Sequence, residues 1–212
     1  MPRLLGTVVT AAFSCDITEE DDGRVWYIAG AAIDADGANG QSGQPAAYNA
    51  SNTGTDFLAN AGMALDGSGN VICAKSWAHD CVILGTDNEP KIFAGGVVAS
   101  KTWYCYPRKA LSDPAAYVDA ETIPYVVAPP LVIQQTAGVV RGCRARVTYN
   151  GVTVDCVVAD RGPQDKIGEL SIAAARALGL PPSPRDGGTE HQEVTYEMWP
   201  GVPAFGFVLQ PA

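Results

Sequence analysis

The chain has 212 residues, with 14 Lys and Arg against 23 Asp and Glu, which gives a formal net charge of −9 at pH 7. Hydrophobic residues make up 47% of the sequence and charged residues 17%, a balance that is typical of globular proteins and excludes a disordered chain. No segment approaches the roughly 18 consecutive apolar residues of a membrane span, and the excess of acids disfavours a phosphate backbone, so we expect neither membrane nor nucleic acid as a partner.

The first half of the chain favours short strands and turns, because glycine and proline are frequent. Residues 7–10 predict a first strand. The apolar stretch around them resembles a short signal peptide, but no A-x-A cleavage site follows it. A longer strand is predicted over 25–33, and residues 56–64 favour a helical turn. Further short strands are expected at 71–74, 82–84, 96–100 and 125–128, with a loop or one helical turn at 110–117.

A β-hairpin is the clearest prediction in the second half. Residues 144–149 and 152–159 alternate in polarity and are joined by Asn150-Gly151. This dipeptide is the strongest short hairpin signal, because both of its residues tolerate positive φ. Pairing across the turn places Tyr149 opposite Val152, with the arginines of the first strand facing away from the core.

A strand–turn–helix unit follows the hairpin. Asp160 ends the second strand, and a helix is predicted over 172–178, with Ser171 as its N-cap and Gly179 as its stop. The remaining predicted strands cover residues 194–198 and 205–209.

The six cysteines show no zinc-binding pattern, because no C-x-x-C pair occurs and the two histidines are far apart in the sequence. Cys73 and Cys81 flank a short loop that a disulfide can close, and Cys143 is diagonal to Cys156 across the hairpin. An even number of cysteines fits a secreted protein, and buried free thiols fit equally well. The pairing therefore stays open.

Two carboxylates flank the turn that follows the hairpin: Asp160 at a strand end and Glu169 two residues before the predicted N-cap. Glycoside hydrolysis needs such a pair, one protonated to donate to the leaving oxygen and one ionised to activate water or attack the sugar. A purely structural role also explains these two acids, since Asp is favoured in turns and Glu near a helix N-terminus. The two residues by themselves leave both roles open.

Motifs in three separate regions of the chain resemble the family 75 glycoside hydrolases, the fungal-type chitosanases. DRGP with the later GELSIAAARALG looks like the strand–turn–helix core of double-psi β-barrel proteins. AIDADGA, GTDFLANAG and VTYEMWPG resemble other parts of that family, so the resemblance covers about residues 25–201. It implies one mainly β domain over 1–212. We expect a double-psi β-barrel-like core with short helices and an N-terminal β extension, built largely from the second half, with the N-terminal half wrapped round it.

The resemblance implies an endo-acting chitosanase that cleaves β-1,4-glucosamine linkages with inversion, and it implies Asp160 and Glu169 as the catalytic pair. We expect Glu169 to be the general acid, because Glu has the higher intrinsic pKa, and Asp160 to be the base, held ionised by the Arg161 guanidinium. The acids around this pair should attract the protonated amines of chitosan. The expected substrate-binding residues are Asp34, Asp36, Tyr48 and Asp56.

No cofactor or metal is expected. The run Asp34-x-Asp36-Gly37 resembles the start of a calcium loop but lacks the other ligands. We expect a secreted monomer whose partner is chitosan. Two alternatives stay open: a peptidoglycan lytic transglycosylase that uses Asp160 alone on the same barrel, and a non-catalytic polysaccharide-binding barrel.

Overall fold

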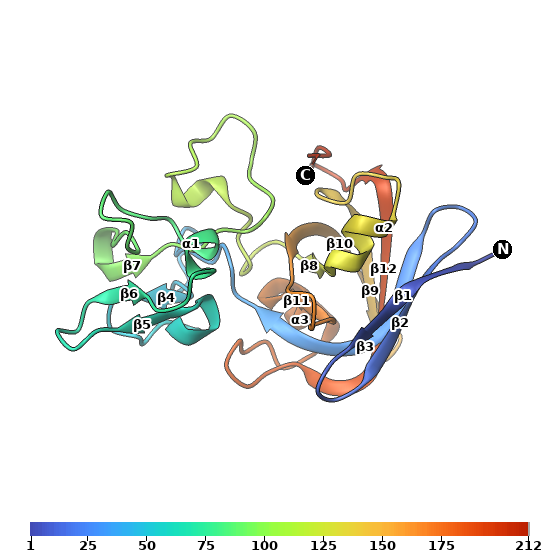
Figure 1. The fold of residues 1–212 in the computed structure, drawn as a ribbon, viewed down its shortest axis with the longest axis horizontal. Helices are drawn as coiled ribbons and strands as arrows, with labels where there is room; N and C mark the ends of the chain where they lie inside the picture. Colours follow the sequence, from blue (N-terminus) through green and yellow to red (C-terminus); the bar gives the residue numbers. More distant parts are fainter. Residues whose placement is uncertain (212) are drawn as a thin grey trace.

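The computed structural model describes residues 1–211 and is built around a closed β-barrel of six strands (Figure 1). Strands make up 37% of the chain and helices 13%, so the expected mainly β fold with short helices is confirmed. The order around the barrel is β3-β11-β8-β10-β9-β12, and β12 closes it by pairing with β3. The barrel strands are β3 (Val25–Asp34), β8 (Tyr125–Ala128), β9 (Cys143–Tyr149), β10 (Val152–Arg161), β11 (Glu169–Ser171) and β12 (Thr189–Pro203).

Two pairs of barrel strands are parallel, β3 with β11 and β8 with β10, and the other pairs are antiparallel. The hairpin of β9 and β10 has the predicted register, with Tyr149 opposite Val152. Arg146 donates to Asp155 on the outer side of this hairpin, at 3.0 and 2.9 Å. The alternation of apolar and charged residues thus fixed which side of the hairpin faces the core.

An N-terminal hairpin extends the barrel wall beyond β3. It consists of β1 (Arg3–Val9) and β2 (Ser14–Glu19), and β2 pairs with β3. The predicted strand at 7–10 is therefore the end of a longer one, and β2 is a strand that the sequence patterns did not indicate. Helix α2 (Pro130–Gln135) lies beside β1, where Arg3 donates to the Gln135 carbonyl at 3.0 Å.

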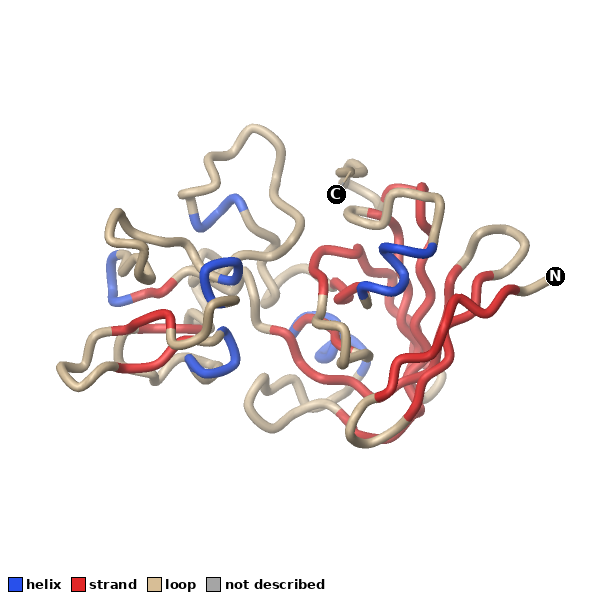
Figure 2. Tube along the Cα trace, viewed as in Figure 1, coloured by secondary structure: helices blue, strands red, loops and turns tan. Residues whose placement is uncertain are grey.

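Residues 35–124 leave the barrel between β3 and β8 and form a smaller lobe at its side, rich in loops (Figures 1 and 2). The expectation that the N-terminal half wraps round the barrel was therefore wrong for these residues. The predicted strands at 82–84 and 96–100 shrink to isolated bridges and the short β7. The lobe contains β4 (Tyr48–Asn49), β5 (Met63–Leu65), β6 (Val71–Cys73), β7 (Val97–Val98), α1 (Ala78–Cys81), and the 3-10 helices η1 (Leu58–Ala61), η2 (Ala94–Gly96) and η3 (Pro114–Ala116).

Helix α3 (Ile172–Leu178) has the predicted bounds and caps. The Ser171 hydroxyl accepts the Ala174 N–H at 3.2 Å, and Gly179 ends the helix with a φ of 77°. The strand predicted at 194–198 is the middle of the much longer β12, and the one predicted at 205–209 was wrong, since those residues form turns and extended loop.

The core of the barrel is dominated by aromatic and branched side chains. Tyr27 of β3 and Tyr196 of β12 are register partners, and their rings stack with centroids 4.9 Å apart. Both are fully buried, so this pair joins the first and last strands of the barrel through apolar area as well as through backbone hydrogen bonds.

All six cysteines of the described chain are free, so the free-thiol alternative holds and neither candidate disulfide is present. Cys143 and Cys156 are buried in the barrel, whereas Cys73 and Cys81 are half-buried in the smaller lobe. None of the helices formed by residues 1–211 is both long and apolar enough for a membrane crossing.

Candidate functional site

Asp34 ends β3, and the turn that follows it carries the chain into the smaller lobe. The Asp34 carboxylate accepts the Asp36 N–H at 2.8 Å, which tightens this turn. Gly37 continues it with a φ of 78°, and a Cβ at this position would lie 1.9 Å from the Val118 carbonyl oxygen. Only glycine fits this turn, and the turn holds both aspartates at the junction of barrel and lobe.

Asp160 reaches the same junction from β10. The register of β10 against β8 shifts between Val158 and Asp160, which marks a bulge just before the carboxylate. Its Oδ1 accepts the Arg161 N–H at 2.7 Å and the Trp103 N–H at 3.0 Å. Arg161 thus acts through its backbone. The expectation that its guanidinium holds Asp160 was wrong, because that side chain is exposed and forms no ion pair with another described residue.

Asp34, Asp36 and Asp160 form what we call the acidic cluster, in which one carboxylate oxygen from each lies within 4.8 Å of the others. Asp34 and Asp160 are almost fully buried. The Tyr125 hydroxyl donates to the Asp36 carbonyl at 3.0 Å and closes one side of the cluster. Three carboxylates this close either share protons or surround a cation, and hard cations such as Mg²⁺ and Ca²⁺ prefer oxygen ligands.

Tyr48 and Asp56 join the cluster from the smaller lobe. The Tyr48 hydroxyl donates to Asp56 Oδ2 at 3.0 Å and lies 3.4 Å from Asp36 Oδ1. The other Asp56 oxygen accepts the Phe57 N–H and the Asn60 amide, each at 2.7 Å. The fold therefore brings together all four residues that were expected to bind substrate, although they are spread over two strands and two loops.

Glu169 begins β11, where it lies in parallel register with Ala32, two residues before Asp34. Side chains two apart on a strand share a face, so Glu169 and Asp34 project to the same side of β3 and β11. Leu170 pairs with Val126 of β8, which sets Glu169 level with Val127, the register partner of Asp160. One strand thus separates the two predicted catalytic residues, and two strand spacings place their backbones about 10 Å apart.

The surroundings of Glu169 differ from those of Asp160. No N–H or hydroxyl of residues 1–211 donates a hydrogen bond to the Glu169 carboxylate, whereas Asp160 accepts two. The loop after β10 passes close to Glu169: a Cβ on Gly162 would lie 3.9 Å from Glu169 Oε2. The carboxylate is therefore half-buried and poorly solvated.

Burial raises the pKa of every acid in this site, and neighbouring carboxylates raise it further for Asp34, Asp36, Asp160 and Glu169. Burial raises the pKa of Glu169 to about 8, with a further rise from Asp34 that Lys166 opposes. Burial raises the pKa of Asp34 to about 6, and for Asp36 and Asp160 burial and the Asp34 charge raise the pKa well above its ordinary value. The site accordingly holds protons at pH values where exposed carboxyl groups have lost theirs.

Sequence reasoning missed two contributors to this site. Tyr125 and the Trp103 backbone N–H contact the cluster, yet Tyr125 lies in a predicted strand of apolar pattern, where a buried tyrosine carries no functional signal. The Trp103 ring itself faces Arg141, with the guanidinium carbon 5.2 Å from its centre. A backbone N–H has no sequence signature at all, so that contact needed the fold.

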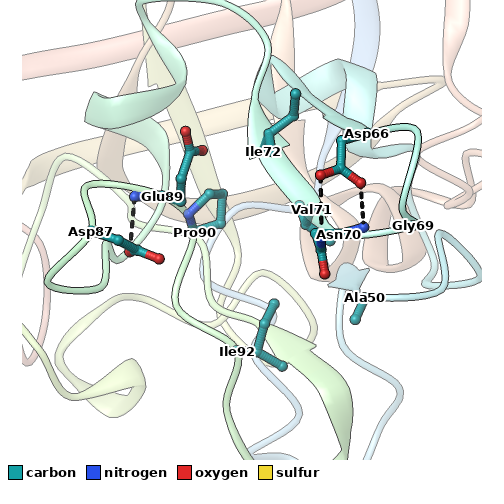
Figure 3. Close-up of a pocket in the computed structure, with 10 residues that line it drawn as sticks. All are labelled: Ala50, Asp66, Gly69, Asn70, Val71, Ile72, Asp87, Glu89, Pro90 and Ile92. Carbon is teal, nitrogen blue, oxygen red and sulfur yellow. Dashed lines mark hydrogen bonds between the residues drawn. The ribbon is translucent and has the colours of Figure 1, made fainter.

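A hollow of about 410 Å³ lies within the smaller lobe, away from the acidic cluster, and none of the predicted site residues lines it (Figure 3). Two of its three acids close local turns, and Glu89 links its loop to β6. Asp66 accepts the Ser68 and Asn70 N–H groups at 2.8 Å, Asp87 accepts the Glu89 N–H, and Glu89 accepts the Cys73 N–H. These contacts explain the acids without a ligand.

No protein-family model matches the sequence, and a search of curated proteins found no match either. The chemistry of the junction between barrel and lobe is therefore the basis for assigning a function.

Proposed function

We propose that this chain is an inverting endo-chitosanase, a glycoside hydrolase that cleaves the β-1,4 linkages of glucosamine polymers. The observation that carries the proposal is the placement of Asp160 and Glu169 on either side of Val127. Inverting enzymes keep their two carboxyl groups 6.5–9.5 Å apart, which leaves room for a water molecule. Backbones about 10 Å apart, with one strand between them, are compatible with that separation.

Glu169 is the general acid in this proposal. Its poorly solvated carboxyl group has a pKa raised to about 8 by burial, so it is protonated at the mildly acid pH at which chitosan is soluble and cationic. It donates this proton to the glycosidic oxygen as the bond to the anomeric carbon breaks. The leaving chain departs with a neutral hydroxyl group, and Glu169 is left as the carboxylate.

Asp160 is the general base and takes a proton from the water that attacks the anomeric carbon from the opposite face. The two backbone N–H groups at its Oδ1 fix the orientation of the carboxylate and lower its pKa, against the larger rise from burial and the Asp34 charge, so Asp160 acts as base when the protons of the cluster lie on Asp34 and Asp36. Asp34 and Asp36 lie close enough to share the proton that Asp160 receives, because the oxygens of the cluster lie within 4.8 Å of one another. Asp34, with a pKa of about 6, is the member that ionises near the working pH.

The substrate class follows from charge. A site with five acidic side chains on a chain of net charge −9 attracts a polycation and disfavours an anionic sugar, although Lys166 lies near Glu169. Asp36, Asp56 and the Tyr48 hydroxyl offer acceptors to an ammonium group. The closed barrel with its parallel β3–β11 and β8–β10 pairs supports the double-psi arrangement that the family resemblance implies.

The test is incubation of the purified chain with chitosan, with reducing ends counted and the first-formed anomer identified by proton NMR. We expect new reducing ends with the α configuration, and no hydrolysis of a neutral β-1,4-glucan. Formation of the β anomer would exclude inversion. Release of anhydro-muramic products from peptidoglycan would indicate the lytic transglycosylase, and the absence of any product would leave the polysaccharide-binding alternative.

A further inference from the structure

A single arginine connects the barrel to the smaller lobe close to the site. The loop between α3 and β12 extends from the barrel toward the lobe (Figure 1). From this loop Arg185 donates through Nη2 to the Gly54 carbonyl at 2.7 Å, and the same nitrogen lies 3.5 Å from the Asp56 carbonyl. Its guanidinium also lies over the Phe57 ring, 4.2 Å from the ring centre. All three contacts fall on one short segment, residues 54–57.

The loop that carries Arg185 is anchored to the barrel. The Gly187 and Gly188 N–H groups donate to the Ser183 and Pro181 carbonyls, both at 2.8 Å, and close a compact turn around the arginine. Gly188 has a φ of 80°, and a Cβ there would lie 1.8 Å from the Ala31 carbonyl oxygen of β3. Arg185 therefore projects from a loop that is packed directly on a barrel strand.

The segment that Arg185 holds is in turn packed on the site. A Cβ on Gly54 would lie 2.2 Å from the Ala47 carbonyl oxygen, and the Asp56 N–H donates to that same carbonyl at 3.0 Å. The Asp56 carboxylate accepts the Tyr48 hydroxyl, which also contacts Asp36 of the acidic cluster. The path from Arg185 to the cluster thus consists of one backbone segment, one carboxylate and one hydroxyl.

We propose that Arg185 is a positioning residue, which holds segment 54–57 against the barrel and thereby sets Asp56 and Tyr48 at the edge of the acidic cluster. The catalytic part of this inference rests on the proposed chitosanase function, but the structural part does not. Without the contacts of Arg185, segment 54–57 has no side-chain hydrogen bond from the α3–β12 loop among the described residues. Asp56 then varies in distance from the cluster, and substrate amines lose a fixed acceptor.

Lysine should replace arginine only in part at this position. The guanidinium donates along its edge while its flat face covers the Phe57 ring, whereas an ammonium group is a compact point charge without a flat face. Arg185→Lys keeps the charge and one donor, whereas Arg185→Met removes both. Arg146→Met is the matched control, because Arg146 also pairs a polar contact, to Asp155, with a contact to an aromatic ring, Trp199, on the outer side of β9.

Hydrogen exchange of the full chain is the first measurement, at the Thr55 and Asp56 amides, which donate to the Ala46 and Ala47 carbonyls. Loss of a hydrogen bond from a charged donor raises the population of the locally open state roughly tenfold or more. Because exchange takes place from that state, we expect exchange at least about tenfold faster in Arg185→Met. We expect an intermediate rate in Arg185→Lys and an unchanged one in Arg146→Met. Unchanged exchange in Arg185→Met overturns the proposal, whatever the activity of the enzyme.

The second measurement is the titration of the Asp56 carboxyl group by NMR. Arg185 is one of the charges that lower the pKa of Asp56 against the rise caused by burial, so its removal should move that titration to higher pH. The control variant should leave it in place. An Asp56 titration that stays unchanged in Arg185→Met, like faster exchange in the control, overturns the proposal.

Activity measurements distinguish the positioning role of Arg185 from the proposed chitosanase function. With wild-type chitosan hydrolysis established, Arg185→Met should lower kcat/KM about ten- to hundredfold through misplaced acceptors, with partial recovery in Arg185→Lys. If exchange and titration change but kcat/KM does not, Arg185 positions Asp56 without serving catalysis, and the catalytic part is overturned. If wild type has no activity on chitosan, the proposed function and the catalytic part are overturned together, and exchange and titration still decide the structural part.

Discussion

Asp160 and Glu169 lie on opposite sides of β8, each one strand away from Val127. They are close in the sequence, and the loop between them passes over the end of β8, so a short connection spans two strand spacings. A helix or a tight turn would have brought the two carboxylates together. The parallel β8–β10 and antiparallel β8–β11 pairings keep them apart, and this separation defines their proposed roles.

Replacement of either proposed catalytic residue should abolish most of the activity without unfolding the chain. Asp160→Asn and Glu169→Gln are each expected to lower kcat on chitosan by at least about a hundredfold, because each removes a general acid or base. Azide, a small anionic nucleophile, should restore some turnover to Asp160→Asn only, with a glycosyl azide as the product. Reducing-end assays give the rates of hydrolysis, and mass spectrometry detects the glycosyl azide, which has no reducing end. Asp155→Asn, on the outer side of the barrel, is the matched control, and near-normal turnover in either site variant would remove that residue from the mechanism.

Stability should fall as the pH rises. Glu169 titrates near its ordinary value of 4.5 in the unfolded chain and near 8 in the folded one. Between these values the folded state keeps a proton that the unfolded state loses, so the free energy of unfolding decreases with pH and levels off above about 8. Asp34 contributes with the same sign between 3.8 and about 6.

Urea unfolding at about pH 5, 6.5 and 8 measures this dependence. Glu169→Gln carries no titrating group at this position, so its stability should fall less steeply over the same range. A Glu169→Gln slope as steep as that of the wild type would show that the glutamate is not the group responsible.

Binding of chitosan should weaken with salt. Raising the ionic strength from about 0.02 M to about 0.5 M shortens the distance over which exposed charges attract from about 20 Å to about 4 Å. We expect KM for chitosan to rise several-fold, with a much smaller change in kcat, because the buried carboxylates are screened less than the long-range field. Thermal unfolding at both salt concentrations controls for stability. A constant KM would contradict the attraction of a polycation by this site.

Ser171 should be important for stability although it contacts no proposed substrate group. Its fully buried hydroxyl accepts the Tyr125 N–H at 3.0 Å and the Ala174 N–H at 3.2 Å, and it donates to the Ile123 carbonyl at 2.9 Å. Ser171→Ala removes an N-cap and leaves buried backbone groups without partners, which costs about 2–3 kcal/mol of unfolding free energy. Ser68→Ala, in an exposed turn, is the control, and a loss below about 0.5 kcal/mol in Ser171→Ala would contradict this role.

The local elements of this fold could be predicted where short-range chemistry decides them. The hairpin at Asn150-Gly151 and helix α3 follow from turn and cap residues, and both have the expected bounds. Strand β11 could not be predicted, because Glu169–Ser171 has no alternation and is a strand only through its neighbours β3 and β8. Strand β2 likewise depends on pairing with β1 and β3.

For the site, the residue types were predictable and their arrangement was not. The acids at 34, 36, 56, 160 and 169 stood out in the sequence, but their approach depends on the strand order of a barrel and on a lobe inserted between two of its strands. The Arg161 side chain was wrongly expected to face Asp160, since adjacent residues on a strand point to opposite faces. Only its backbone N–H remains beside the carboxylate.

The insertion of residues 35–124 between β3 and β8 also affects the order in which the molecule can fold. The first residues of β3 pair early with β2, but Ala32 pairs with Glu169 and Val25 pairs with Met198, so the rest of one edge and the whole of the other depend on strands more than 130 residues later in the chain. During synthesis on the ribosome, the lobe emerges long before these partners do. The barrel can close only after β12 has been synthesised, and such long-range pairing makes folding slow. The acidic cluster, which needs both β3 and β10, forms only after the chain as far as Asp160 has left the ribosome.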